Sequence, residues 1–180
     1  MRKEYGKALR DIFAERMQRD HPEWTPVAAP KPWYWSGERV YVQQRGPMWL
    51  VLVLQPNLKD YESFHIEVGW SRLGRVPELS MRPSFATPGT PEALACEEYV
   101  CRLSELVPAA ATDRELWDGW VVEPFVTAES VEESVAVMAA RLEKIGAAEA
   151  RARVAPHLED AFGALVAFGI PYLEEAVVGM

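Results

Sequence analysis

The segment 71–90 carries three arginines and has neither a helical nor a strand-like hydrophobic period. The three are Arg72, Arg75 and Arg82. A guanidinium group can hold a phosphate or a carboxylate through parallel hydrogen bonds, and long irregular loops are often functional. The segment predicts either a ligand-binding loop or an irregular crossover that packs Leu73, Leu79 and Phe85 onto a sheet. No glycine-rich phosphate loop accompanies the arginines.

His65 and Glu67 form a second candidate pair, because they fall on the same face of an expected strand over residues 63–70. Two such groups can begin a metal or acid–base site, but the sequence offers no third ligand. A polar strand face is the alternative interpretation. The three histidines are far apart and none belongs to a tight ligand motif, so we predict no metal and no cofactor.

Nucleophile signatures are also missing from the sequence. There is no G-x-S-x-G motif. Cys96 falls on the apolar face of an expected helix and is predicted to be buried. Cys101 lies off that face and is predicted to be more exposed, but no base is paired with it. We therefore predict no catalytic residue and lean towards a protein that is not an enzyme.

Acidic and aromatic residues are the other candidates. Paired glutamates lie at Glu97-Glu98 and Glu132-Glu133. Adjacent helical positions diverge by about 100°, so such pairs are poor catalytic dyads and good surface charge. Asp118 lies close in sequence to Trp117 and Trp120, and acids beside aromatic rings can bind a sugar or a basic peptide. The alternative places these tryptophans in the core with the acids outside.

The negative charge lies almost wholly in the second half of the chain. The net charge is −8, and residues 91–180 contain six basic and seventeen acidic residues, a local net charge of −11. This sign disfavours binding to nucleic-acid phosphates and favours a basic partner. Acidic helix faces that only keep the protein soluble are the alternative.

The first half predicts a helix followed by an antiparallel meander. The helix is expected over residues 3–20, with a buried stripe formed by Tyr5, Leu9, Ile12, Phe13 and Met17. Residues 22–32 contain four prolines and should be an extended connector. Strands are expected at 38–44, 48–55 and 63–70, the second with both faces buried. Strand alternation across W-Y-W predicts that Trp33 and Trp35 lie in the core and that Tyr34 faces outward.

The second half predicts mostly helices. Thr90 and Pro91 should start one whose buried stripe is Ala93, Cys96, Val100, Leu103 and Val107. Residues 119–126 suggest a strand. Ser130 should cap a helix with an apolar stripe of Val131, Val135, Met138, Leu142 and Ile145, ended by Gly146. Pro156 should open a last helix with Leu158, Phe162, Leu165 and Val166 inward, broken by Gly169 and Pro171.

These elements predict one α+β domain over residues 1–180, with residues 1–90 forming a helix and sheet and residues 91–180 mainly helical and acidic. The antiparallel sheet should have three to five strands, packed with the N-terminal helix and several C-terminal helices. No run approaches the roughly 18 apolar residues of a membrane span, and the charged N-terminus does not resemble a signal peptide. We therefore expect a cytoplasmic protein that binds neither membrane nor nucleic acid.

The order helix, W-x-W-S-G-E-R-V-Y-V-Q-Q, apolar strand, F-H-I-E-V-G-W-S resembles a group of small bacterial domains. That group looks like part of the immunity-protein repertoire that neutralises polymorphic or contact-dependent toxins. The resemblance covers roughly residues 5–85. It implies a protein that caps a toxin, and it assigns a role to no individual residue. The tandem W-Y-W and the long acidic helical half depart from the group.

We therefore expect a non-catalytic binding protein, an immunity-type inhibitor that masks a basic partner. The partner-binding residues should be Tyr34, Tyr41, Glu97, Glu98, Trp117, Asp118, Trp120, Glu132 and Glu133. A first alternative is an enzyme or small-ligand binder with a pocket between the sheet and the loop 71–90. Its residues would be His65, Glu67, Arg72, Arg75 and Arg82. A second alternative is a structural subunit of a larger assembly.

Overall fold

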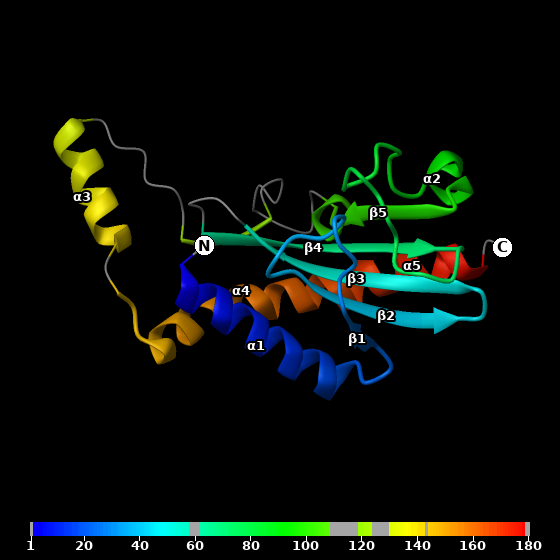
Figure 1. The fold of residues 1–180 in the computed structure, drawn as a ribbon, viewed down its shortest axis with the longest axis horizontal. Helices are drawn as coiled ribbons and strands as arrows, with labels where there is room; N and C mark the ends of the chain where they lie inside the picture. Colours follow the sequence, from blue (N-terminus) through cyan, green and yellow to red (C-terminus); the bar gives the residue numbers. More distant parts are fainter. Residues whose placement is uncertain (1, 58–61, 109–118, 124–129, 143, 179–180) are drawn as a thin grey trace.

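The computed structural model describes residues 2–57, 62–108, 119–123, 130–142 and 144–178 (Figure 1). The helices are α1 (Lys3–Asp20), α2 (Pro91–Ala95), α3 (Val131–Leu142), α4 (Ala147–Ala164) and α5 (Ile170–Val178). The strands are β1 (Thr25–Val27), β2 (Arg39–Arg45), β3 (Met48–Pro56), β4 (Glu62–Ser71), β5 (Glu98–Arg102) and β6 (Trp120–Glu123). A 3₁₀ turn (Leu103–Glu105) follows β5, and a π-helical turn (Leu165–Gly169) joins α4 to α5.

The strands form one antiparallel sheet in the order β1-β2-β3-β4-β5, and β6 also pairs with β4. This arrangement confirms the α+β class and the antiparallel meander. In the described chain the sheet has six strands, because β1 lies within the expected connector and β5 lies within an expected helix.

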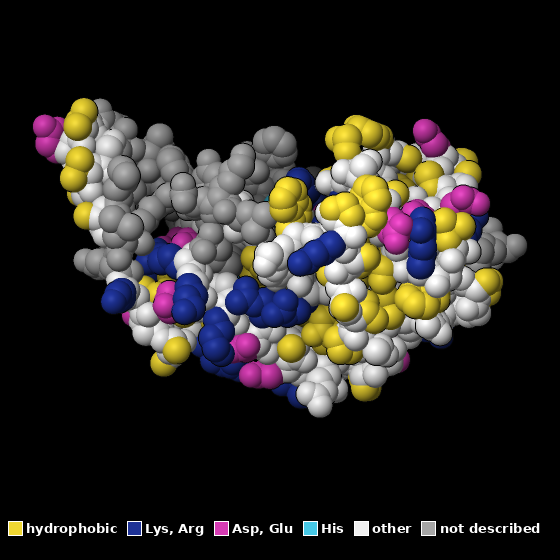
Figure 2. Space-filling view, viewed as in Figure 1, with side chains coloured by type: hydrophobic (Ala, Val, Ile, Leu, Met, Phe, Trp, Pro, Cys, Tyr) yellow, Lys and Arg dark blue, Asp and Glu magenta, His cyan; other side chains and the backbone are white. Residues whose placement is uncertain are grey.

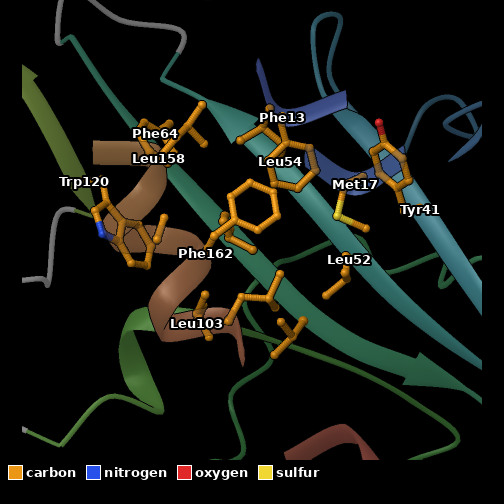
Figure 3. Packing of buried hydrophobic residues seen from close by; sticks show 14 of the residues in the cluster. Phe13, Met17, Tyr41, Leu52, Leu54, Phe64, Leu103, Trp120, Leu158 and Phe162 are labelled. Carbon is orange, nitrogen blue, oxygen red and sulfur yellow. The ribbon is translucent and has the colours of Figure 1, made fainter. Parts of the chain in front are cut away.

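One face of the sheet is covered by α1 and α4, which lie side by side (Figure 1). The predicted stripe of α1 is confirmed, because all five of its residues are buried. The helix ends before His21-Pro22, as the restriction on residues preceding proline requires. Phe13 packs against two rings in this core, with its ring centroid 5.6 Å from that of Tyr41 and 5.1 Å from that of Phe162 (Figure 3).

The opposite face is covered by loops. Its buried residues are mainly the valines Val40, Val42, Val51, Val53, Val76 and Val100. The predicted alternation of faces is confirmed in β2, where Val40 and Val42 lie on this face and Tyr41 on the other, and in β4, where alternate residues from Phe64 to Trp70 join the helical core. The predicted burial of both faces of β3 is also confirmed. The side chains that close this face come from residues 27–34 and from the loop 71–90, whose Val76 and Leu79 pack on the valines. We call this side the loop-covered face.

The expectation of one helix that starts at Thr90-Pro91 and carries a buried stripe as far as Val107 is wrong. Thr90 does cap a helix, accepting a hydrogen bond from the backbone of Ala93, but α2 ends at Ala95. Residues 98–102 instead pair with β4, because Tyr99, Val100 and Cys101 suit a pleated strand buried on both faces. Cys101 is therefore buried and Cys96 partly exposed, the reverse of the expectation.

The C-terminal helix also differs from the expectation. Gly146 is the N-cap of α4 and does not end α3, and Pro156 lies inside α4. Apolar packing of the inward stripe, with Leu158, Phe162 and Leu165 buried as predicted, sustains the helix through the proline. Val166, expected inward, is exposed. Gly169 and Pro171 do not break the helix, since the chain continues into α5.

Residues 147–178 form a continuous helical segment that is long and apolar enough, by length and composition alone, to cross a membrane. It is the one such helix in the described ranges, and a core helix of a soluble protein passes the same test. Its buried side chains, among them Leu158 and Phe162, belong to the core formed with the sheet (Figure 3).

The close pairing of β4 with β5 depends on Gly69, which faces Val100 across the ladder. A Cβ atom at Gly69 would lie 2.0 Å from the backbone oxygen of Tyr99. We predict that Gly69→Ala lowers the free energy of unfolding by at least about 3 kcal/mol, because a backbone atom cannot move aside cheaply. Urea denaturation followed by far-UV circular dichroism measures this.

The matched control is Gly163→Ala, at an exposed position of α4 where an added Cβ meets no atom within 4 Å. It should raise the free energy of unfolding by roughly 0.5–1 kcal/mol, because alanine is the better helix former. Equal stabilities for the two variants would contradict the close approach of β4 and β5.

Candidate functional site

The aromatic triplet Trp33-Tyr34-Trp35 lies in a turn and not in a strand. The predicted orientation of Tyr34 and Trp35 is wrong: Tyr34 is 5% exposed and Trp35 is 62% exposed. Tyr34 is buried because its hydroxyl donates to the backbone oxygen of Pro77 at 2.9 Å and the guanidinium of Arg82 lies over its ring at 4.0 Å. Burial raises the pKa of Tyr34 to about 12.

Arg82 is the centre of a buried ion cluster on the loop-covered face. Its side chain is 4% exposed, with one nitrogen 2.7 Å from Glu38 Oε1 and Nε 3.3 Å from Glu67 Oε2. Glu38 also accepts hydrogen bonds at 2.9 Å from the Trp35 backbone and from the Gln55 amide. The cluster thus joins the turn before β2, the strands β3 and β4, and the loop 71–90.

Glu67 is the group with the most perturbed environment in this cluster. It is completely buried, and neither of its carboxylate oxygens makes a hydrogen bond in the described part of the chain. Burial raises the pKa of Glu67 to about 7; Arg82 opposes the shift and the negative charge of Glu38 adds to it. Burial lowers the pKa of Arg82, but Glu67 and Glu38 outweigh it and the pKa rises overall. The arginine stays cationic while Glu67 is poised to bind a proton near neutral pH.

A buried carboxyl with such a pKa is a candidate for acid–base chemistry. Glu67 and the Arg82 side chain are sealed beneath the loop, so a substrate would reach them only if the loop 71–90 moved. The chemistry that the closed arrangement supports is binding of a proton and attachment of the loop to the sheet.

Large apolar side chains are exposed on the two segments that contribute to this cluster, the turn before β2 and the loop 71–90. They are Trp35, Leu73, Met81 and Phe85. Met81 adjoins Arg82, and the backbone of Trp35 is bonded to Glu38. Phe85 follows Ser84, which exchanges hydrogen bonds with the backbone of Val100 in β5. We call these four residues the loop surface, and Figure 2 shows hydrophobic side chains gathered over the loop between β4 and α2.

The other predicted aromatic anchors lie in the core or outside the described residues. Tyr41 is buried against Phe13. Trp120 is buried, and its indole nitrogen donates to Asp160 at 2.9 Å. We expected a partner to contact Tyr34, Tyr41 and Trp120, but the side chains of all three are buried. Trp117 and Asp118 lie outside the described residues.

The glutamates are divided between two settings. Glu97 is exposed, but it precedes β5 and does not lie on a helix. Glu98 is mostly buried and accepts from Arg75 Nε at 3.1 Å. Glu132 and Glu133 are exposed in the first turn of α3, where Ser130 accepts from the Glu133 backbone as predicted. Figure 1 shows α3 standing away from the sheet.

The predicted ligand-binding residues converge only in part. Arg82 and Glu67 meet, as described above. Arg72 donates to the backbone oxygen of Leu94 at 2.6 Å, and Arg75 is shared between Glu78 and Glu98. His65 shares the face of Glu67, as predicted, and lies against Gly119. Among the described residues no three His, Cys, Asp or Glu side chains are grouped so that they could hold a metal ion.

Glu38 is the residue that sequence reasoning missed. It has the same strand parity as Val40 and Val42, so the alternation that placed these valines inward also predicts an inward carboxylate. An inward acid needs a buried cation, and the loop arginines were the available partners. No sequence pattern indicated that Trp35 would be exposed, because the argument from alternation assumed a strand where the structure has a turn.

A second charged cluster lies at the N-terminal end of α1. Glu62 accepts from the backbone and Nε of Arg2 at 3.1 Å, and Glu123 bonds with Arg2, Tyr5 and Arg153. These contacts join β4 and β6 to α1 and α4. Burial raises the pKa of Tyr5 to about 12.

The chain matches no protein-family model, no curated protein and no solved structure.

Removing the cation of the buried cluster should be costly. Arg82→Met keeps an apolar stem but leaves Glu38 and Glu67 without their guanidinium. We expect a loss of about 3–5 kcal/mol in the free energy of unfolding. The control Arg75→Met removes a half-exposed arginine of the same loop and should cost less than about 1 kcal/mol. Chemical denaturation of both variants tests this, and equal losses would show that burial of the ion pair is unimportant.

Glu67 should make stability depend on pH. Its pKa is about 7 when folded and 4.5 in the unfolded reference, so between these values the folded state binds more protons. Ionisation of Glu67 therefore lowers the free energy of unfolding as the pH rises from about 4.5 to about 7. Glu67→Gln removes this contribution. The free energy of unfolding of the wild type, minus that of Glu67→Gln, should fall as the pH rises from about 4.5 to about 7 and stay constant above pH 7. Chemical denaturation at several pH values measures this difference. A constant difference from pH 4 to pH 8 would refute the raised pKa.

Proposed function

We propose that the chain is a non-catalytic binding protein whose partner contacts the loop surface formed by Trp35, Leu73, Met81 and Phe85. The observation that carries this proposal is the exposure of these side chains, 62% for Trp35 and 87% for Phe85, on two segments fixed by the buried ion cluster. Tryptophan, phenylalanine and methionine are enriched in protein interfaces, and adjacent exposed apolar groups mark interaction sites.

The anchoring of the loop surface supports binding over catalysis. The cluster, the Tyr34–Pro77 hydrogen bond and the Ser84–Val100 hydrogen bonds hold the two segments before any partner arrives. A surface that is already ordered loses less conformational entropy on association. The charged groups that could do chemistry, Arg82, Glu38 and Glu67, meanwhile form ion pairs with one another beneath the surface.

The partner is a basic protein on this proposal. The net charge of −8 favours encounter with a basic molecule, and the exposed Glu132 and Glu133 of α3 add to that attraction. Charge would speed association, and the loop surface would supply the contact area. The inhibitor role implied by the resemblance of residues 5–85 to immunity domains is the specific form of this proposal: masking a basic toxin in the bacterial cytoplasm.

One observation favours a second candidate function. Arg82, Glu38 and Glu67 converge between the sheet and the loop 71–90, where a small-ligand site was expected, and Glu67 has a pKa of about 7. If the loop opened, these groups could bind a small molecule or transfer a proton. The loop surface favours the first function, because its exposed aromatic groups have no part in such a site.

The test captures partners from a lysate of the source organism at low and high salt and identifies them by mass spectrometry. One basic protein, recovered in stoichiometric amount and weakened by salt, is the expected result. The double variant Trp35→Ser/Phe85→Ser should weaken its binding at least tenfold, because a lost interface anchor commonly costs about 2 kcal/mol.

The matched control is Val166→Ser, which removes an exposed apolar side chain from the π-helical turn. It should leave binding unchanged. Full binding by the double variant, or no specific protein at either salt concentration, would overturn the proposal. Self-association of the wild type that the double variant abolishes would point to a structural subunit.

A further inference from the structure

A cavity of about 170 Å³ lies beside the first turns of α1. Its walls come from α1, from the turn that precedes β2 and from the end of β3. Its lining includes Arg2, Lys3, Arg10, Ser36 and Gly37. Space of this size holds roughly five water molecules at ~30 Å³ each, and hence a small ion with part of its hydration.

The lining of this cavity is cationic. Arg2, Lys3 and Arg10 contribute three positive charges, and no carboxylate belongs to the lining. Arg2 is neutralised by Glu62 and Glu123. Lys3 and Arg10 make no ion pair within the described part of the chain, which leaves two unneutralised cations facing one cavity.

Arg10 is held in an environment that disfavours its charge. Burial lowers the pKa of Arg10, the nearby guanidinium of Arg39 lowers it further, and the neighbouring Asp11 only partly compensates. An anion in the cavity would offset this repulsion. Arg10 also lies close to the turn, since a Cβ atom on Gly37 would be 3.9 Å from Arg10 Nη1.

The remaining lining suits an oxyanion. Ser36 brings a hydroxyl group that can donate a hydrogen bond. The N-terminal end of α1, which carries partial positive charge, adds to the potential of the side chains. A guanidinium and an ammonium beside a hydroxyl donor are the groups that bind phosphate and carboxylate oxygens in proteins.

We propose that this cavity binds a small oxyanion, a phosphate or carboxylate group, through Arg10 and Lys3. The site shares no residue with the loop surface, and its assignment does not depend on the proposed partner. It also differs from the expected ligand site beneath the loop 71–90, because none of its residues belongs to that loop.

The test uses isothermal titration calorimetry at low ionic strength with two probes, inorganic phosphate and acetate. Saturable binding of one anion per chain is the expected result. Tighter binding of phosphate would identify a phosphoryl site, and tighter binding of acetate a carboxylate site. Failure of both probes to give a saturable signal at millimolar concentrations would overturn the proposal.

Three variants separate a specific site from general electrostatic attraction. Arg10→Ala, Lys3→Ala and Lys7→Ala each remove one positive charge from α1, and Lys7 is exposed, pairs with Asp11 and does not line the cavity. Arg10→Ala should weaken binding at least tenfold and Lys3→Ala severalfold, while Lys7→Ala should stay within twofold of the wild type. Equal weakening by all three would overturn the site. Lys3 is exposed, so Lys3→Ala against Lys7→Ala decides the matter if Arg10→Ala does not fold.

Discussion

One buried guanidinium, that of Arg82, lies between two carboxylates and holds the loop-covered face of the sheet together. The helical face carries the larger apolar cluster, to which α1 and α4 bring the side chains of Phe13 and Phe162. The opposite face is built mainly of valines and covered by loops, and its buried cluster holds fewer apolar side chains. Burial of the carboxylate in a medium of low dielectric constant raises the pKa of Glu67, and the negative charge of Glu38, which shares the same cation, adds to the shift.

The cluster also explains why the exposed side chains occur where they do. Trp35 is bonded through its backbone to Glu38, and Met81 precedes the arginine that Glu38 holds. Fixing the buried residues therefore fixes the backbone that carries the exposed ones. The acidic second half of the chain contributes exposed charge. Of the four predicted interface glutamates, Glu98 forms an ion pair with Arg75, and Glu97, Glu132 and Glu133 remain at the surface.

Sequence patterns predicted the elements whose period is unambiguous. The buried stripe of α1, the alternation of faces in β2 and β4 and the burial of both faces of β3 follow from side-chain direction alone. Residues 96–102 could not be assigned in this way, because Cys96, Val100 and Leu103 fit a helical stripe while Tyr99-Val100-Cys101 fits a buried strand. Pairing with β4 decided between them, and that pairing is a tertiary effect.

The candidate site was predictable in part. Arg82 and Glu67 were both singled out, but their meeting depends on how the loop 71–90 returns across the sheet. Glu38 could have been found from its parity with Val40. Trp35 could not, since exposure in a turn follows from packing of the neighbouring Tyr34 against Pro77 and Arg82.

The π-helical turn at Leu165–Gly169 keeps the two ends of the long C-terminal helical segment in phase. Ala150 and Ala176 are both buried and stand 26 positions apart, which is about 7.2 turns of a regular α-helix. On a straight helix this would rotate Ala176 roughly 80° away from the side that Ala150 presents. One extra residue in the wide turn reduces the interval to about seven whole turns. The wider π-helical turn thus lets one continuous helical segment present the same face to the core along its whole length.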